Sequence, residues 1–236
     1  AGTTTATFSD KNAANGKTVT LTATSLSGAN AANYSISLTG APTTTANITA
    51  KELTIAGSFT ASNKVYDGTT AATIASNSLT LTGLISGDTV SINAGSTTAT
   101  FSDRNVATGK TVTLTATSLS GANAANYSIS LTGAPTTTAN ITAKELTIAG
   151  SFTASNKVYD GNTTAQIANA GSLTGLVQGD SVNVSNTGAT FADKNAGVNK
   201  TVTLNGLSLS GVDSANYSIT GLVTDTATIT PKTLTI

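Results

Sequence analysis

The sequence lacks four residue types that carry much of protein chemistry: its 236 residues include no Cys, His, Met or Trp. Without cysteine there is neither a disulfide framework nor a thiolate metal site. Without histidine or cysteine, the commonest catalytic bases and nucleophiles are missing. No G-x-S-x-G turn and no phosphate-cradling glycine loop takes their place. We therefore expect that the chain is not an enzyme and has no cofactor.

Charge and long apolar runs are also scarce. Charged residues make up 9% of the chain, and 11 basic residues balance 11 acidic ones. A protein that neutralises nucleic-acid phosphates needs a basic face. A membrane-spanning helix needs roughly 20 consecutive, mostly apolar residues, and no segment approaches that. These features predict no nucleic-acid partner and no membrane insertion.

What the sequence does contain is a long internal repeat. The segment from Lys17 to Gly68 recurs letter for letter from Lys110 to Gly161, and a diverged third copy follows. A period of about 90 residues is too long for a solenoid coil and matches a small domain. In phase with the recurring Lys-Val-Tyr-Asp-Gly motif, we predict the C-terminal part of a repeat at 1–55, a complete repeat at 56–148 and a complete, diverged repeat at 149–236.

Each copy has the pattern of β-strands. Val19, Leu21 and Ala23 alternate with threonines, as in a half-buried strand. Ala13–Gly16 is predicted to form a hairpin turn, and Gly28–Asn33 a single helical turn. The sequence therefore predicts an all-β fold: an elongated tandem array of small β-rich modules, either β-grasp-like or immunoglobulin-like sandwiches.

Two sets of recurring residues are candidate structural sites. In the Tyr-Asp-Gly triplet, we expect tyrosine to pack at a junction between modules, aspartate to accept backbone N–H bonds in a turn, and glycine to adopt positive φ. Recurring aspartates could cap turns or contribute to a weak calcium site, although none has the density of a calcium-binding loop. The triplet residues are Tyr66, Asp67, Gly68, Tyr159, Asp160 and Gly161. The recurring tyrosines are Tyr34, Tyr127 and Tyr217, and the recurring aspartates are Asp10, Asp88, Asp103, Asp180 and Asp193.

The lysines suggest a further possibility. Lys11, Lys17 and Lys51, with many asparagines, provide the groups that an intramolecular isopeptide crosslink requires. The alternative is that these lysines are solvated or protect strand edges from unwanted pairing. We favour the second interpretation.

The ordered set KVYDG, SGD, FSDKN, KTVTL, ANYSI and KTLTI resembles the YDG-repeat family, which is related to mostly bacterial β-grasp modules of large surface adhesins and haemagglutinin-like exoproteins. The resemblance covers essentially the whole chain. It implies a secreted, extracellular protein at a bacterial cell surface. The third copy departs from the pattern, because Glu52 and Glu145 become Thr233.

These observations lead to three hypotheses of function. The first is a structural spacer or stalk in a cell-surface adhesin or extracellular fibre, whose partners are the neighbouring repeats. The second is a module that binds a host ligand, a glycan or ice through threonine-rich faces. The third is a self-assembling filament or biofilm-matrix subunit, in which copies of the chain exchange strands through unpaired sheet edges.

Overall fold

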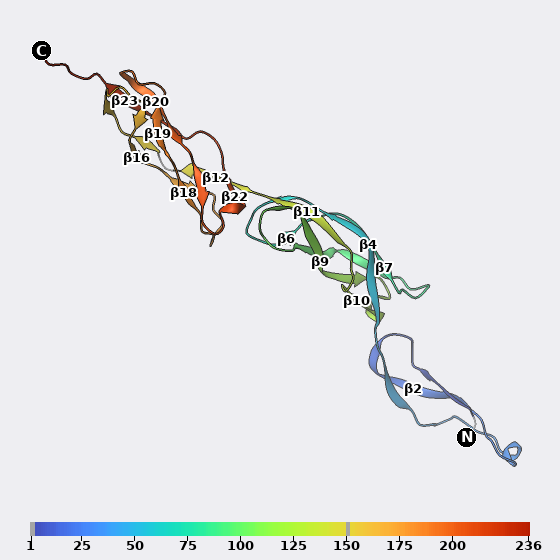
Figure 1. Cartoon of the computed structure of the whole chain (residues 1–236). Coiled ribbons are helices and arrows are strands. Elements are labelled where there is room, and N and C mark those ends of the chain that lie inside the picture. The colour runs from blue at the N-terminus through green and yellow to red at the C-terminus, as the bar shows by residue number, and fades with distance from the viewer. Residues whose placement is uncertain (1–2, 150–151) are drawn as a thin grey trace. The chain divides into compact units, whose positions relative to one another are not determined.

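The computed structural model describes residues 3–149 and 152–236. This part of the chain consists of β-strands, turns and three 3-10 helices of one turn each (Figure 1). The predicted all-β fold is confirmed. None of the helices among these residues has the length and apolar character to cross a membrane.

The chain divides into two compact units, and each unit combines residues from two copies of the repeat. Unit 1 comprises Ala1–Ala61, Thr73–Thr100 and Val112–Thr137, and unit 2 comprises Ser62–Ala72, Phe101–Thr111 and Thr138–Ile236. The first copy therefore packs with part of the second, and the rest of the second packs with the third.

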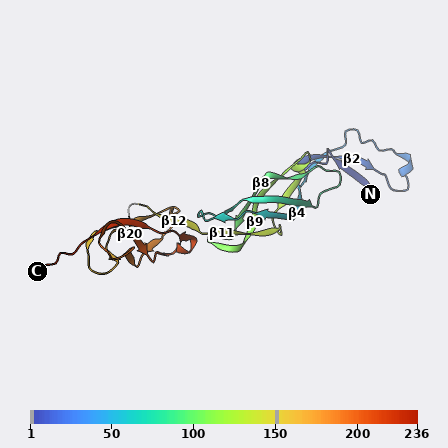
Figure 2. The ribbon, with the colours of Figure 1, turned by 90° about the horizontal axis from the view of Figure 1, so that it is seen from above.

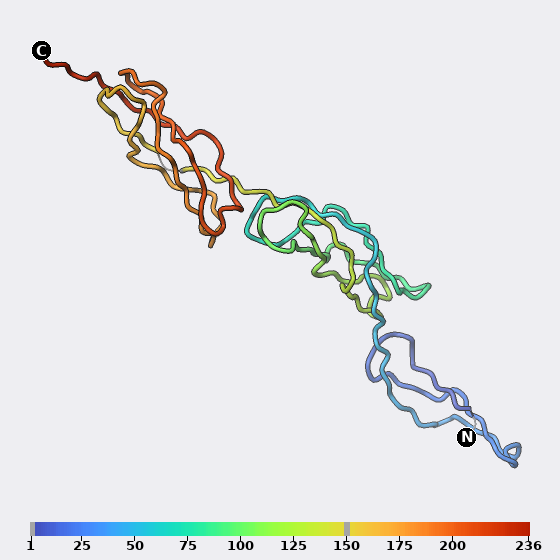
Figure 3. The backbone as a smooth tube through the Cα atoms, viewed as in Figure 1, coloured from blue at the N-terminus to red at the C-terminus, as the bar shows by residue number. Residues whose placement is uncertain are grey.

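Unit 1 contains two three-stranded sheets, with orders β1-β2-β3 and β10-β4-β7 (Figure 1). The first is antiparallel throughout, and Figure 3 shows its chain as long extended segments. In the second, β4 pairs parallel with β10 and antiparallel with β7. The elements are β1 (Thr4–Phe8), β2 (Ala14–Thr24), η1 (Ala31–Asn33), β3 (Thr44–Ile48), β4 (Lys51–Ala61), β7 (Ile74–Thr82), η2 (Ala124–Asn126) and β10 (Tyr127–Ser130).

Three long strands have residues in both units: β8 (Ser91–Phe101), β9 (Ala107–Ser120) and β11 (Thr136–Thr142). The other elements of unit 2 are β5 (Lys64–Val65), β6 (Ala71–Ala72), β12 (Lys144–Ala149), β13 (Thr153–Ala154), β14 (Lys157–Val158), β15 (Thr164–Ala165), β16 (Ile167–Asn169), β17 (Ser172–Thr174), β18 (Asn183–Ser185), β19 (Gly188–Phe191), β20 (Gly197–Asn205), β21 (Ser208–Ser210), η3 (Ser214–Asn216), β22 (Tyr217–Ile219) and β23 (Thr224–Thr230).

A five-stranded sheet of unit 2 has the order β14-β23-β20-β19-β15, and Figure 2 shows its strand β20, together with β12, from a second direction. β14 runs parallel to β23, and β5 runs parallel to β11 in the same way. A short parallel strand just before each Tyr-Asp-Gly triplet thus anchors the triplet to the last long strand of its own copy.

Period-2 alternation places the apolar side chains as predicted. In β9, Val112 and Leu114 are buried, while Thr111, Thr113 and Thr115 are exposed. A single cluster forms the core of the third copy and contains Phe152, Ala165, Ala189, Phe191, Val202, Leu204, Ala227 and Ile229. The helical turn predicted within Gly28–Asn33 is confirmed at Ala31–Asn33, and equivalent turns directly precede Tyr127 and Tyr217.

The predicted hairpin turn at Ala13–Gly16 is wrong, because the turn occurs earlier. β1 ends at Phe8 and β2 begins at Ala14, so residues 9–13 make the connection. Asp10 shapes this turn by accepting the Asn12 backbone N–H at 2.7 Å. Gly16, at φ 64°, instead forms a bulge within β2, where the register against β3 shifts.

Candidate functional site

Each Tyr-Asp-Gly triplet is a tight turn closed by the lysine two residues before the tyrosine. The Lys64 Nζ donates to Asp67 Oδ1 and to the Thr69 carbonyl, both at 2.8 Å. Asp67 Oδ1 also accepts the Thr69 backbone N–H at 2.8 Å, and Gly68 adopts φ 78°. Burial alone would raise the pKa of Asp67, but the bonds from Lys64 and Thr69 hold it below its usual value.

The second triplet repeats this geometry. The Lys157 Nζ donates to Asp160 Oδ1 at 2.8 Å, Asp160 Oδ1 accepts the Asn162 N–H at 3.1 Å, and Gly161 adopts φ 83°. Each lysine also lies over a phenylalanine ring: Lys64 is 5.5 Å from the centre of the Phe101 ring, and Lys157 is 5.4 Å from that of Phe191.

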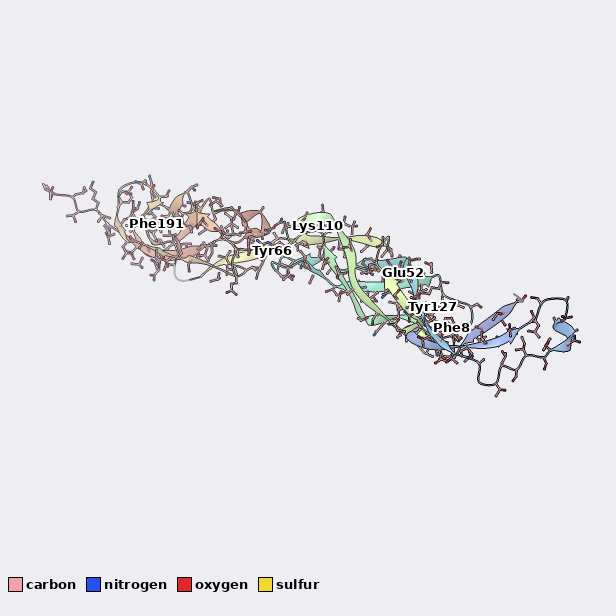
Figure 4. The ribbon with its side chains drawn as sticks, turned by 90° about the horizontal axis from the view of Figure 1, so that it is seen from below. Phe8, Glu52, Tyr66, Lys110, Tyr127 and Phe191 are labelled. Carbon is pink, nitrogen blue, oxygen red and sulfur yellow. The ribbon has the colours of Figure 1, made fainter. Side chains whose placement is uncertain are left out.

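The turn places the Tyr66 side chain against the next copy. Its backbone N–H donates to the Thr142 carbonyl at 2.8 Å, which continues the β5–β11 pairing within the second copy. Its hydroxyl donates to Asp180 Oδ2 of the third copy at 2.8 Å. The side chain is 1% exposed, and Figure 4 labels it.

Asp180 is the centre of this contact. Its carboxylate also accepts the Tyr217 hydroxyl at 2.6 Å and the Arg104 Nη1–H at 3.0 Å. The Asp180 side chain has no exposed surface, and a buried carboxylate is tolerated only when paired and hydrogen-bonded. Burial would raise the pKa of Asp180, but the bonds from Tyr217, Tyr66 and Arg104 lower it.

Arg104 extends the contact because its second nitrogen, Nη2, donates to Asp213 Oδ1 at 2.9 Å. The rings of Tyr66 and Tyr217 meet edge to face, with centres 5.4 Å apart and planes at 77°. Burial, together with the bond to Asp180, raises the pKa of Tyr66 to about 12. We call Tyr66, Arg104, Asp180, Asp213 and Tyr217 the unit 2 junction.

Asparagines fasten the backbone beside the unit 2 junction. Asn216 Oδ1 accepts the Val106 N–H at 2.9 Å, and its Nδ2 donates to Asn105 Oδ1 at 3.2 Å. Gly68 packs so closely that a Cβ there would lie 2.6 Å from Val177 Cγ1. The second and third copies therefore meet through direct, buried contacts.

Unit 1 has an equivalent contact between the first and second copies, which we call the unit 1 junction: Lys11, Asn12, Asp88, Asn126 and Tyr127. The Tyr127 hydroxyl donates to Asp88 Oδ2 at 2.6 Å, and Lys11 Nζ lies 3.5 Å from Asp88 Oδ1. Asn126 Oδ1 accepts a backbone N–H from the first copy at 2.8 Å, and its Nδ2 donates to Asn12.

The unit 1 junction also borders a cavity of about 180 Å³. It is lined by Lys11, Ala13, Ile48, Thr49, Lys51, Ile85, Asp88, Asn126 and Tyr127.

Asp10, Asp103 and Asp193 occupy the turn after the phenylalanine strand in each copy. Each pairs with the lysine seven residues later: Lys110 to Asp103 at 2.7 Å, Lys200 to Asp193 at 2.5 Å, and Lys17 to Asp10. The bond from that lysine is the main cause of the lowered pKa of each aspartate.

The expectation that Lys17 is solvated is wrong: its side chain is buried. The structure describes no bond between Lys17 and an asparagine side chain.

The third recurring tyrosine and the threonine hydroxyls lie outside the two junctions. Tyr34 is 73% exposed, whereas Tyr127 and Tyr217, at the same position of their copies, are buried. Many exposed threonine hydroxyls bond to each other across strands, as in Thr98 with Thr115 at 3.0 Å. In the described part of the chain, no three acidic side chains gather into a group that could hold a metal ion.

A family model of the YDG domain matches residues 1–46, 49–139 and 142–229. The chain belongs to the YDG domain family. The three matched YDG segments begin at 1, 49 and 142, whereas the predicted repeats begin at 1, 56 and 149. No curated protein and no solved structure matches the chain.

Sequence reasoning on the YDG triplet missed its partners. It singled out Tyr66 and Tyr217 but not Arg104, Asp213 or Asn216, which hold the other side of the contact. It considered Asp180 only as a turn cap or calcium ligand. The sequence did contain a signal that Asp180 matters. Its Gly-Asp pair, in the tripeptides Ser-Gly-Asp (ending at Asp88) and Gln-Gly-Asp (ending at Asp180), recurs in both complete copies, as the YDG triplet does.

Proposed function

We propose that this chain is a structural spacer, a segment of a stalk in a secreted bacterial cell-surface adhesin or extracellular fibre. The observation that carries the proposal is the unit 2 junction, in which Asp180 binds Tyr66 of one copy and Tyr217 of the next. A spacer needs consecutive modules that resist bending, and a buried carboxylate hydrogen-bonded by groups of both modules is a specific way to fix one orientation.

The form of the contact also supports a mechanical role. Asp180 has no exposed surface, and its two oxygens accept bonds from two tyrosines and one arginine. Such a carboxylate holds neighbouring groups and offers no open position to a substrate. Several exposed threonine hydroxyls are bonded across strands, which favours sheet stabilisation over a dedicated glycan site.

Small-angle scattering on arrays of two, three and four repeats tests the spacer. A compact module of about 90 residues has a radius of gyration near 12 Å, so each repeat should add roughly 30 Å to the maximum dimension. The expected result is an equal increment for each added repeat. A maximum dimension that stays flat as repeats are added would refute the proposal.

A further inference from the structure

Arg104 is the only arginine in the chain, and it belongs to the unit 2 junction. Its counterparts in the first and third copies are Lys11 and Lys194, in otherwise similar turns. Across the unit 2 junction Arg104 donates to Asp213, whose counterpart in the second copy is Asn123. The chain thus combines arginine with aspartate in unit 2 and lysine with asparagine in unit 1.

In unit 2, one guanidinium group joins two carboxylates. Arg104 Nη1 donates to Asp180 Oδ1 at 3.0 Å, and Nη2 donates to Asp213 Oδ1 at 2.9 Å. The Asp180 side chain has no exposed surface and that of Asp213 is 13% exposed, so water screens neither charge well. The planar fork of arginine can bind both carboxylates at once, whereas the ammonium of lysine is a single point charge.

In unit 1, the same place holds only one carboxylate. Lys11 Nζ lies 3.5 Å from Asp88 Oδ1, and the Lys11 side chain is 78% exposed. Asn123 Oδ1 accepts the Thr89 N–H at 2.9 Å, and an oxygen of Asp213 accepts the equivalent N–H of unit 2 at the same distance. The asparagine therefore keeps the bond within its own copy without adding a second negative charge, and one lysine is sufficient.

A mixed combination leaves one group unmatched. Lysine in place of Arg104 would leave either Asp180 or Asp213 without a cation, beside a second carboxylate that repels it. Arginine opposite Asn123 would have its second nitrogen without a charged acceptor. Two interfaces that each penalise the other's partner are the physical basis of selectivity.

We propose that Arg104 and Asp213 determine which copies join: a turn with arginine accepts a neighbour with aspartate at the place of Asp213, and a turn with lysine accepts one with asparagine. The tyrosine, the Gly-Asp aspartate and the asparagine after the helical turn are the same residue types in both junctions, so they cannot distinguish one neighbour from another. The third copy docked on the first copy's turn would set Lys11 opposite both Asp180 and Asp213. This proposal does not rest on the spacer function.

Hydrogen exchange of the intact chain tests the pair in unit 2. The Val106 amide, which bonds to Asn216 across the junction, reports its opening. Arg104→Lys should lower its protection about 10-fold, the loss of one hydrogen bond between charged groups. Adding Asp213→Asn should restore most of that protection, because it recreates the combination of unit 1.

The Ala13 amide, which makes the corresponding bond to Asn126 in unit 1, is the internal control and should keep its protection in both variants. Unchanged protection of Val106 in Arg104→Lys, or a double variant that is no better protected than Arg104→Lys alone, overturns the proposal.

The reciprocal exchange tests whether the pair also acts in unit 1. Asn123→Asp should lower the protection of the Ala13 amide, because it sets a second carboxylate beside Asp88 with only Lys11 to pair with both. Adding Lys11→Arg should restore the protection, while the Val106 amide stays unchanged throughout. If Lys11→Arg does not compensate for Asn123→Asp, the pair does not select neighbours and the proposal is wrong.

Discussion

At the scale of single residues, Asp180 accounts for most of the chemistry of the unit 2 junction. A carboxylate without exposed surface is unfavourable unless its partners satisfy it, and here Tyr66, Tyr217 and Arg104 all do so. Removing one partner therefore weakens the contact, and removing the carboxylate leaves several groups without their acceptor.

Tyr66→Phe should lower the free energy of unfolding of unit 2 by about 1–2 kcal/mol, because one hydrogen bond to a charged group is lost while the ring stays. Denaturant unfolding measures this change. The matched variant is Tyr34→Phe, where the side chain is 73% exposed and the change should stay within about 0.5 kcal/mol. Equal effects of the two variants would show that the Tyr66 hydroxyl contributes nothing.

Alkaline pH should weaken the same contact. The folded chain holds the Tyr66 proton up to a pKa of about 12, whereas an unfolded tyrosine loses it near 10. Between these values the unfolded state binds fewer protons, so stability falls as pH rises. The contribution of Tyr66 is fully present below pH 10 and is lost toward pH 12. In denaturant unfolding at several pH values, the gap between the wild type and Tyr66→Phe should narrow above pH 10. A constant gap contradicts this assignment.

At the scale of elements, the YDG turn joins a short parallel strand to the contact between copies. Its glycines provide an internal comparison, because Gly68 and Gly161 adopt nearly the same positive φ. A Cβ at Gly68 would lie 2.6 Å from Val177 Cγ1, and one at Gly161 would meet nothing within 4 Å. The two positions share backbone strain, and only Gly68 adds a steric conflict across the unit 2 junction.

Gly161→Ala should cost about 1–2 kcal/mol from the left-handed backbone alone. Gly68→Ala should cost at least about 1 kcal/mol more, because valine is stiff at χ1 and cannot easily move away. Denaturant unfolding of the two variants measures the difference. If both cost the same, Val177 does not pack against the turn as described.

The sequence predicted the elements better than the contacts between them. Alternation identified the strands, as at Val112 and Leu114, because burial on one face of a strand leaves a period of two. The hairpin turn was misplaced because Asn-Gly is also compatible with a bulge, and the turn itself is set by Asp10. Asn216 could not be predicted, because its partners are more than 100 residues away in the chain.

At the scale of the whole molecule, the repeat is a module with its own core, and a buried carboxylate, Asp180, links it to its neighbour. The two compact units both contain residues of adjacent copies. Single modules of this size bury little apolar surface and are marginally stable. Arrays of such modules gain from nearest-neighbour contacts, and we expect that to hold here.

Acid should also weaken the unit 2 junction. The pKa of Asp180 is lowered, so its contribution to stability is present above the usual carboxyl pKa of about 4 and is lost as pH falls below it. Hydrogen exchange at pH 6 and pH 3, corrected for intrinsic rates, should show a selective loss of protection at Val106 and Val177, whose amides bond to Asn216 and Tyr217. Protection that falls equally throughout unit 2 would contradict a junction-specific effect.

The most direct test of the central claim is a distance measurement across the unit 2 junction. Because the chain has no cysteine, Thr108→Cys and Thr201→Cys give two unique, exposed positions for spin labels, one in each copy. If the Tyr66–Asp180–Tyr217 contact fixes neighbouring copies, the labels should give one narrow distance distribution. That distribution should broaden when Tyr66→Ala is added. A broad distribution in the otherwise unchanged chain, or a narrow one that Tyr66→Ala leaves untouched, would show that the tyrosine contact does not hold the copies in place.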